Sequence, residues 1–286
     1  MIKRIAFLLI IFLFFGLKES FSLPNLPEEI FFAGQKIDLE KTRYLKERVE
    51  AEFYDYLQDK ESVLTAKRAG RYFPIFEKAL AEAGLDEDWK YLAITESNLK
   101  PMAGSMANAS GLWQFIPSTG KRFGLKINAI IDERYDPVLA SEAAVKYIKE
   151  LLSLFNNDIF LAMAGYNAGE NNITNALKQQ GIKDFWSLYY RNKNYPHNET
   201  LRYVPRVIAA KIIFSDIDRY FGLSESELYK PFEFNEISVE VKEKLKSLVE
   251  IAKEHSSALL DLKTLNPQIK TDYLPRGKYK IKFPVK

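Results

Sequence analysis

Glu96 is the residue of this sequence best placed for acid–base chemistry. It follows Ala93 by three positions and Leu92 by four, so a helix through this segment puts it on their apolar face. Pro101 disfavours helical geometry at the residue before it, which predicts that the helix ends soon after Glu96. Burial and the negative end of the helix dipole both raise the pKa of a carboxyl group above its ordinary value of about 4.3. A carboxylic acid that keeps its proton near neutral pH can act as a general acid.

An isolated glutamate most often packs its stem and extends its carboxylate into water, and this alternative stays open for Glu96 taken alone. The surroundings of Glu96 favour the chemical interpretation, because polar and aromatic motifs follow it in a fixed order. These motifs are Glu96-Ser97 with Pro101 and Ser105; Ala109-Ser110-Gly111-Leu112-Trp113-Gln114-Phe115-Ile116-Pro117; Gly165-Tyr166-Asn167-Ala168-Gly169-Glu170; and Glu199-Thr200-Leu201-Arg202-Tyr203-Val204-Pro205. Taken singly, Trp113 and Phe115 would be core aromatics and Glu199 a surface charge.

In order and spacing, these four motifs resemble the catalytic domain of lytic transglycosylases, which has the goose-type-lysozyme-like fold. The tryptophan of the second motif is most similar to the membrane-bound type D of lytic murein transglycosylases. The resemblance covers about residues 72–214. Two positions depart from the pattern: Asn108 stands where glycine is usual, and Gly165 where alanine is usual. Asparagine tolerates left-handed backbone, and glycine costs little in one helical turn, so neither removes a chemical group from the site.

The resemblance implies a role for each matched residue. Glu96 would be the sole catalytic acid and base, and Ser105 would hydrogen-bond it or the substrate. The residues that would bind the substrate are Ser105, Gln114, Tyr166, Asn167, Glu199 and Tyr203. The implied partner is a peptidoglycan glycan strand, and neither a metal nor an organic cofactor is implied.

The implied reaction cleaves the β-1,4 bond between N-acetylmuramic acid (MurNAc) and N-acetylglucosamine (GlcNAc). Glu96 would protonate the glycosidic oxygen and then, as a carboxylate, take the proton of the MurNAc 6-hydroxyl while that oxygen attacks C1. The product would carry a 1,6-anhydro ring. Two alternatives stay open. One is a water-using muramidase, which needs a second carboxylate, with Glu199 the first candidate; the other is a non-catalytic protein that binds the cell wall.

Apolar side chains recur at three- and four-residue steps along most of the chain, which predicts a mainly α domain from about Thr42 to Gly222. The expected helices cover residues 45–57, 72–83, 86–93, 137–155, 158–164 and 204–214. Asp136-Pro137 and Asp158 are typical helix starts, and Gly84 is typical of a helix end. Residues 23–38 contain two prolines and a glycine and predict an irregular lead-in.

The pattern changes after Leu223. Phe232 and Phe234 indicate a strand, the apolar residues between Val241 and Ala252 indicate a helix, and a second helix covers residues 259–265. Alternating residues 279–283 then indicate a final strand. This strand–helix–helix–strand order predicts a small α+β module that resembles a divergent LysM peptidoglycan-binding module. A structural cap on the catalytic domain is the alternative.

The N-terminus has the pattern of a secretory signal peptide. Two basic residues precede an apolar run from Ile5 to Phe15, and cleavage after Ser22 suits the small residues there. The run is shorter than the roughly 20 apolar residues that cross a bilayer easily. An uncleaved segment that associates with the membrane is the alternative, and both predict an exported protein of the bacterial periplasm or cell envelope.

Composition excludes several other classes of protein. The net charge of +3 is too small for a dedicated nucleic-acid binder, and the absence of cysteine excludes disulfides and thiolate zinc sites. The only two histidines, His197 and His255, lie far apart in sequence, which disfavours a histidine zinc site. The expected organisation is a signal peptide (1–22), an N-terminal helical extension (23–70), a catalytic domain (71–222) and the C-terminal module (231–286).

Overall fold

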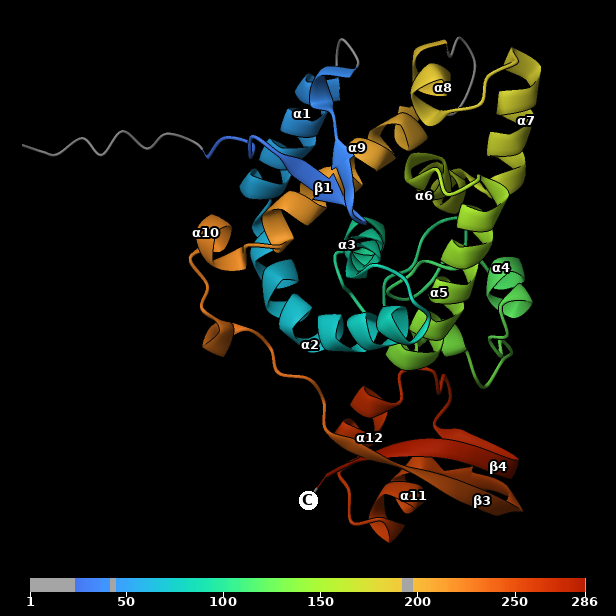
Figure 1. The fold of residues 1–286 in the computed structure, drawn as a ribbon. Helices are drawn as coiled ribbons and strands as arrows, with labels where there is room; N and C mark the ends of the chain where they lie inside the picture. The colour runs from blue at the N-terminus through green and yellow to red at the C-terminus, as the bar shows by residue number, and fades with distance from the viewer. Residues whose placement is uncertain (1–23, 42–44, 192–197, 286) are drawn as a thin grey trace, which may run out of the picture.

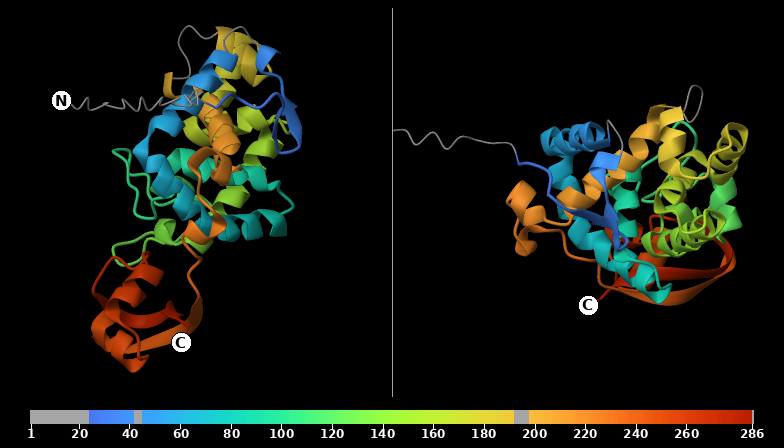
Figure 2. Two further views of the ribbon diagram at one scale, coloured as in Figure 1. Left: turned by 90° about the vertical axis from the view of Figure 1, so that its left-hand side faces the viewer. Right: turned by 45° about the horizontal axis from the view of Figure 1, so that its top comes forward.

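The computed structural model describes residues 24–41, 45–191 and 198–285, and leaves the side chains of residues 190, 191, 198 and 199 undescribed. Figure 1 shows a helical body with a smaller module of strands and helices beneath it, and the left view of Figure 2 shows the same two parts from the side. The predicted signal peptide, residues 1–22, lies outside the described residues. Among the helices described, none combines the length and the apolar character needed to cross a membrane.

The helical body confirms the prediction of a mainly α domain. Its α-helices are α1 (Leu45–Gln58), α2 (Lys60–Glu82), α3 (Tyr91–Ser97), α4 (Pro117–Arg122), α5 (Pro137–Leu154), α6 (Ile159–Ala168), α7 (Glu170–Gln180), α8 (Phe185–Arg191), α9 (Asn198–Phe214) and α10 (Ile217–Phe221). Short 3-10 helices lie at Leu39–Lys41, Glu87–Lys90, Glu133–Tyr135 and Glu225–Glu227. The short helix α3 lies in the middle of the body, where it packs against α9 (Figure 1).

Local sequence signals set several helix ends. The carboxylates of Asp136 and Asp158 accept hydrogen bonds from the first backbone N–H groups of α5 and α6, as predicted. In contrast, α2 begins at Lys60 and not near Tyr72. The first half of α2 buries small side chains, Ser62, Thr65, Ala66 and Ala69, and these leave no apolar stripe that a sequence pattern could detect.

The expected irregular lead-in was wrong for residues 30–37. Strands β1 (Ile30–Phe32) and β2 (Gln35–Ile37) pair antiparallel. Ala33 and Gly34 turn the chain between them with φ angles of 49° and 73°, the left-handed geometry of a tight hairpin. Phe32 is fully buried and packs edge-on against Trp89, with ring centroids 5.4 Å apart. The hairpin therefore belongs to the core of the helical body.

The C-terminal module has the predicted strand–helix–helix–strand order. It consists of β3 (Phe234–Ser247), α11 (Leu248–Glu254), α12 (Leu259–Leu265) and β4 (Tyr273–Pro284), with β3 and β4 antiparallel. The expected helix start near Val241 was wrong, because β3 continues to Ser247 and pairs with β4 on both sides of an irregularity between Val241 and Leu245. Leu245 is 58% exposed and thus lies on no buried helix face. A Ser247–Glu250 capping box sets the true helix start at Leu248.

The module has its own small apolar core and is joined to the helical body by backbone and charged contacts. The small core includes Val241, Leu248, Ile251, Leu274 and Ile281. Between the two parts, Asp132 N–H donates to the Gln268 carbonyl oxygen, and Lys270 N–H donates to that of Ile130, both at 2.8 Å. The Lys282 ammonium lies 2.6 Å from an oxygen of Asp136, and both side chains are almost fully buried. Asp136 therefore both caps α5 and holds the module.

Candidate active site

Helix α3 carries Glu96 at its second-last position. The helix ends at Ser97, directly before Asn98 and Leu99, which adopt left-handed φ angles of 48° and 53°. The Ser97 hydroxyl donates to the carbonyl oxygens of Ala93 and Leu112, which lies in the second motif, at 2.9 Å each. This bond ties the helix end to the second motif, and Glu96 is left half-buried beside it.

Tyr203 is a hydrogen-bond partner of Glu96. Its phenol donates to Glu96 Oε1 at 2.6 Å, from helix α9. Tyr203 is 5% exposed, and burial together with the nearby negative charge of Glu96 raises the pKa of its phenol well above the usual value. The phenol therefore stays protonated and available as a donor at any pH at which the protein would work.

Replacing Tyr203 with phenylalanine removes this hydrogen bond while keeping the ring. A hydrogen bond to a charged group contributes about 1.5–3 kcal/mol, so we expect Tyr203→Phe to lower turnover of the substrate proposed below about 10- to 100-fold. Steady-state rates measured beside Tyr273→Phe, an exposed tyrosine of β4, provide the comparison. Equal rates for Tyr203→Phe and wild type would remove Tyr203 from the site.

The second motif forms a tight turn against the core. Gly111 and Gln114 have φ angles of 80° and 47°. The Gln114 amide nitrogen donates to the Gly111 carbonyl oxygen at 2.8 Å and to that of Ala103 at 3.3 Å. Trp113 is 1% exposed and its indole N–H donates to the Ser141 hydroxyl at 2.9 Å. Trp113 is thus a core residue, and both Trp113 and Gln114 contribute to the wall of the cleft described below.

Gly111 has no space for a side chain. A Cβ atom there would lie 1.9 Å from the backbone oxygen of Arg134, and its φ of 80° disfavours other residues. We expect Gly111→Ala to lower the free energy of unfolding by about 2–4 kcal/mol, from backbone strain and overpacking together. Gly124→Ala isolates the strain, because Gly124 has a φ of 97° and open space around it. Denaturant unfolding of both variants gives the comparison, and equal losses would show that the contact with Arg134 is unimportant.

The third and fourth motifs meet at the ends of α6 and α9. Tyr166 donates from its phenol to the Trp113 carbonyl oxygen at 2.9 Å, and Asn167 Oδ1 accepts from the Thr200 hydroxyl at 2.8 Å. Burial and the charge of Glu96 raise the pKa of Tyr166 well above the usual value. Gly169 ends α6 with a φ of 85°. Glu199 lies in α9, but its side chain falls outside the described part of the chain.

Two smaller sequence predictions concern the turn and α6. Asn108 adopts a left-handed φ of 59°, so asparagine keeps the turn in which glycine is usual. The Ser105 hydroxyl accepts a hydrogen bond from Ala109 N–H at 3.1 Å inside this turn. Gly165 does more than lower helix propensity, because a Cβ there would lie 2.8 Å from the Phe155 ring.

Residues from all four motifs line one cleft of about 850 Å³. Of the predicted site residues, the cleft brings together Glu96, Ser105, Gln114, Tyr166, Asn167 and Tyr203. The sequence prediction missed Thr95, Glu170, Arg202 and Arg206, which line the same cleft. The described residues contain no group of three or more histidines, aspartates and glutamates that could hold a metal ion.

Glu170 is a second carboxylate in this cleft. It accepts hydrogen bonds from the Tyr147 phenol at 2.9 Å and from Arg122 at 2.6 Å. Burial raises the pKa of Glu170, but the hydrogen bonds from the backbone, Tyr147 and Arg122 outweigh burial and lower it overall. Its place directly after Gly169 in the third motif was the signal that could have identified it. The carboxylate of Asp132, another acid near the second motif, does not line this cleft; it is buried and paired with Arg134 at 2.7 Å.

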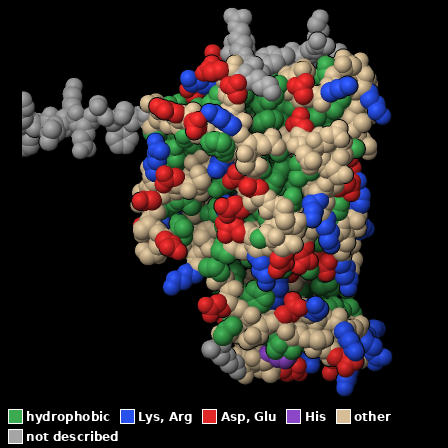
Figure 3. Space-filling model, in the orientation of Figure 1, with side chains coloured by type: hydrophobic (Ala, Val, Ile, Leu, Met, Phe, Trp, Pro, Cys, Tyr) green, Lys and Arg blue, Asp and Glu red, His purple; other side chains and the backbone are tan. Residues whose placement is uncertain are grey.

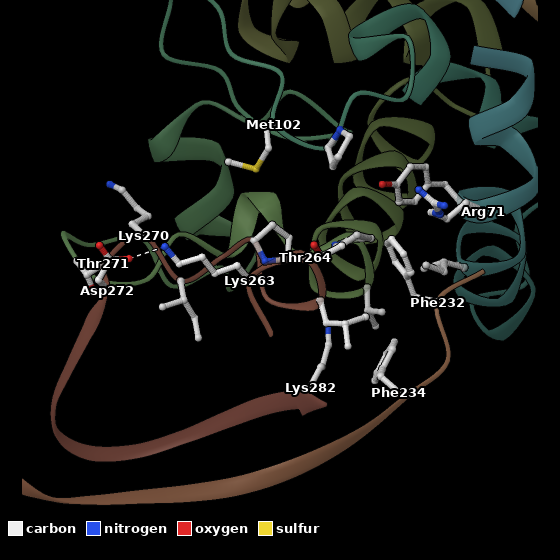
Figure 4. A pocket seen from close by; sticks show the side chains of 18 residues that line it. Arg71, Met102, Phe232, Phe234, Lys263, Thr264, Lys270, Thr271, Asp272 and Lys282 are labelled. Atoms are coloured by element: carbon white, nitrogen blue, oxygen red, sulfur yellow. Dashed lines mark hydrogen bonds and ion pairs between the residues drawn. The ribbon is translucent and has the colours of Figure 1, made fainter. Parts of the chain in front are cut away.

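A second groove of about 460 Å³ lies between the helical body and the module (Figure 4). Arg71 and the two phenylalanines Phe232 and Phe234 lie on one side, and Lys263 and Asp272 lie on the other. Asp272 is the one carboxylate among the described residues that line it, and it pairs with Lys263 at 2.5 Å. The described residues that line this groove therefore include no carboxylate outside an ion pair. Acidic and basic side chains are interspersed on the face drawn in Figure 3.

Comparisons with known proteins match part of the chain to transglycosylases. Residues 73–189 match the family model described as "Transglycosylase SLT domain". The chain is 32% identical to the membrane-bound lytic murein transglycosylase D of Escherichia coli K12 over 65% of its own length and 38% of the relative. It is 34% identical to peptidoglycan transglycosylase gp16 of Escherichia phage T7, over 44% of the chain and 10% of the relative. The chain thus spans well under half the length of these relatives.

Among solved structures, the 70 kDa soluble lytic transglycosylase Slt70 of Escherichia coli overlaps with a TM-score of 0.46 at 18% identity. This overlap covers 66% of the chain and 33% of Slt70.

Proposed function

Because residues 73–189 form a transglycosylase SLT domain and the chain is a homologue of lytic murein transglycosylases, we propose that it is a peptidoglycan lytic transglycosylase. It would cleave the β-1,4 bond between MurNAc and GlcNAc and form 1,6-anhydro-MurNAc. The observation that carries this proposal is the half-buried Glu96, which accepts a hydrogen bond from Tyr203 in a cleft that all the predicted site residues except Glu199 line.

Glu96 performs both proton transfers in this proposal. As the acid it donates its proton to the glycosidic oxygen, and the C1–O bond to GlcNAc breaks. As the carboxylate it then accepts the proton of the MurNAc 6-hydroxyl, and the O6–C1 bond forms. No water is consumed. The attack is intramolecular and gains from effective molarity, so a second carboxylate is unnecessary.

The residues around Glu96 bind and orient the sugar in this proposal. The Tyr203 phenol fixes one carboxyl oxygen, and Tyr166 and Asn167 line the same cleft. Ser105, Gln114 and Glu199 complete the proposed substrate-binding set. Side chains that are already held by hydrogen bonds need little reorganisation when charge develops in the transition state. Preorganised polar groups of this kind increase the rate of the reaction.

Digestion of purified peptidoglycan with the full-length chain tests the proposal. Mass spectrometry of the soluble products should show species one water lighter than those of a muramidase. Products with free reducing ends would make the protein a hydrolase, with Glu170 or Glu199 as the second carboxylate. Bound but intact glycan would identify a non-catalytic wall-binding protein.

We also propose that residues 231–286 are a divergent LysM-like module that binds glycan strands. The strand–helix–helix–strand order supports this, and so do the exposed basic side chains of Arg276 and Lys278 on β4. Co-sedimentation with peptidoglycan should weaken in the double variant Arg276→Gln, Lys278→Gln. Unchanged sedimentation would favour the structural cap.

The proposed organisation and location follow the sequence. Residues 1–22 would be a signal peptide or an uncleaved membrane anchor, residues 23–70 an N-terminal extension that is helical apart from the β1–β2 hairpin, and residues 71–222 the catalytic domain. The matched type D relative is named as membrane-bound, which supports a place in the bacterial cell envelope. Fractionation of cells that express the chain would test this location, and recovery of the protein in the cytoplasmic fraction would contradict it.

A further inference from the structure

Arg206 is a half-buried cation in the wall of the Glu96 cleft. It lies on α9 three residues after Tyr203, a helical rise of about 4.5 Å. Its Nε–H donates to the Tyr56 phenol oxygen at 3.3 Å, and its guanidinium carbon lies 5.2 Å from the centre of the Tyr56 ring. Tyr56 is buried, so it holds the guanidinium plane in one orientation.

Most N–H donors of the Arg206 guanidinium have no hydrogen-bond partner among the described residues. Arginine carries five N–H donors, and Nε–H alone has a hydrogen-bond partner among the residues that the structure describes. Other arginines near the cleft are paired with carboxylates: Arg202 with Glu52 at 2.6 Å, and Arg122 with Glu170 at 2.6 Å. Among the described residues, no carboxylate forms an ion pair with Arg206; the charge of Glu52 helps to raise its pKa, but Glu52 itself pairs with Arg202. The free N–H donors of Arg206 could therefore bind an incoming anion.

We propose that Arg206 binds a carboxylate attached through the lactyl ether of MurNAc, either the lactyl carboxylate itself or, in intact strands where that group is an amide, an acid group of the peptide stem. This inference rests on the proposed function. Glu96 would act at C1 of MurNAc, and the lactyl ether leaves C3 of the same ring, so an anion there lies within reach of a side chain one helical turn from Tyr203. The planar guanidinium suits bidentate binding of a carboxylate.

The N-terminal extension takes part in this site. Tyr56 belongs to α1, and both α1 and α9 lie outside the matched residues 73–189. Helix α1 packs along α9, and Glu52 of α1 also pairs with Arg202. The extension therefore orients a substrate-binding cation, in addition to covering the core.

Arg206→Gln tests the inference on three substrates: intact peptidoglycan, strands stripped of their stems by an amidase, and intact strands whose carboxylates have been converted to amides. We expect kcat/KM to fall about 10- to 100-fold on the carboxylate-bearing substrate, as for a lost charge-assisted bidentate contact. On the amidated strands we expect wild type and variant to be equal. Arg206→Lys should recover part of the loss.

The matched control is Arg219→Gln. Arg219 also lies over a tyrosine ring, 5.3 Å from the centre of Tyr220, but outside the cleft. A lower kcat/KM of Arg206→Gln on stripped strands would identify the lactate as the bound group. A lower kcat/KM on intact strands alone would identify an acid group of the stem. Equal loss on all three substrates would mean that Arg206 is structural, and no loss on any would also overturn the inference.

Product release by the wild type tests the proposed function separately from the role of Arg206. If wild type releases no products, the proposed reaction is wrong. Sedimentation of wild type and Arg206→Gln with the three substrates then measures the carboxylate contact by binding. Binding that is independent of both the variant and the amidation would overturn the inference.

Discussion

Glu96→Gln is expected to lower the rate of peptidoglycan cleavage by about 10²- to 10⁴-fold, the usual contribution of a positioned general acid–base group. The glutamine carbonyl oxygen can still accept the Tyr203 hydrogen bond, so the cleft should keep its geometry. A carboxamide has no proton to give to the glycosidic oxygen and cannot take one from the 6-hydroxyl. Release of soluble muropeptides from sacculi measures the loss.

Two further variants make the Glu96 result interpretable. Glu142→Gln changes an exposed glutamate of α5 and should leave the rate unchanged. Glu170→Gln changes the second carboxylate of the cleft, and in a transglycosylase it should cost far less than Glu96→Gln. Unaltered thermal unfolding of Glu96→Gln would exclude misfolding. Persistent lysis by this variant would contradict the assignment of Glu96 as the acid.

Lys282→Met is expected to lower the free energy of unfolding by about 3–5 kcal/mol, as found when one member of a buried ion pair is removed. Lys282 and Asp136 are 6% and 2% exposed, and 2.6 Å separates their charged atoms. The variant would leave the Asp136 carboxylate buried without its cation, although it still caps α5. Denaturant unfolding followed by far-ultraviolet circular dichroism measures the loss.

Lys280→Met is the control, because Lys280 is an exposed residue of the same strand and pairs with Glu236 at the surface. It should change stability by less than about 1 kcal/mol. The double variant Lys282→Met, Asp136→Asn should recover part of the loss, since the uncompensated charge is then gone. A loss for Lys282→Met as small as that for Lys280→Met would show that the ion pair does not hold the module.

Features set by neighbouring residues could be read from the sequence. Asp136 and Asp158 cap their helices because a short polar side chain reaches the first free N–H groups. The motif spacings likewise led to a set of residues that, Glu199 aside, share one cleft. The signal for α11 was present in the Ser247–Glu250 capping box, but the four-residue spacing of apolar residues suggested an earlier helix start.

Features set by distant pairing could not be read from one sequence. The length of β3 depends on its register with β4, and the Lys282–Asp136 pair joins residues 146 positions apart. Arg206 became notable only once Tyr56, from a different helix, was seen beside it. A sequence pattern reports which residues share a helix face, but it does not report which helix that face meets.

Digestion of peptidoglycan in ¹⁸O-labelled water tests the central claim most directly. An intramolecular attack by the MurNAc 6-hydroxyl takes no oxygen from the solvent, so the new MurNAc ends should carry no label. A hydrolase places one solvent oxygen at C1 of every new end. The predicted result is unlabelled anhydro products from wild type, formed at least about 100-fold more slowly by Glu96→Gln. Labelled reducing ends would contradict the account.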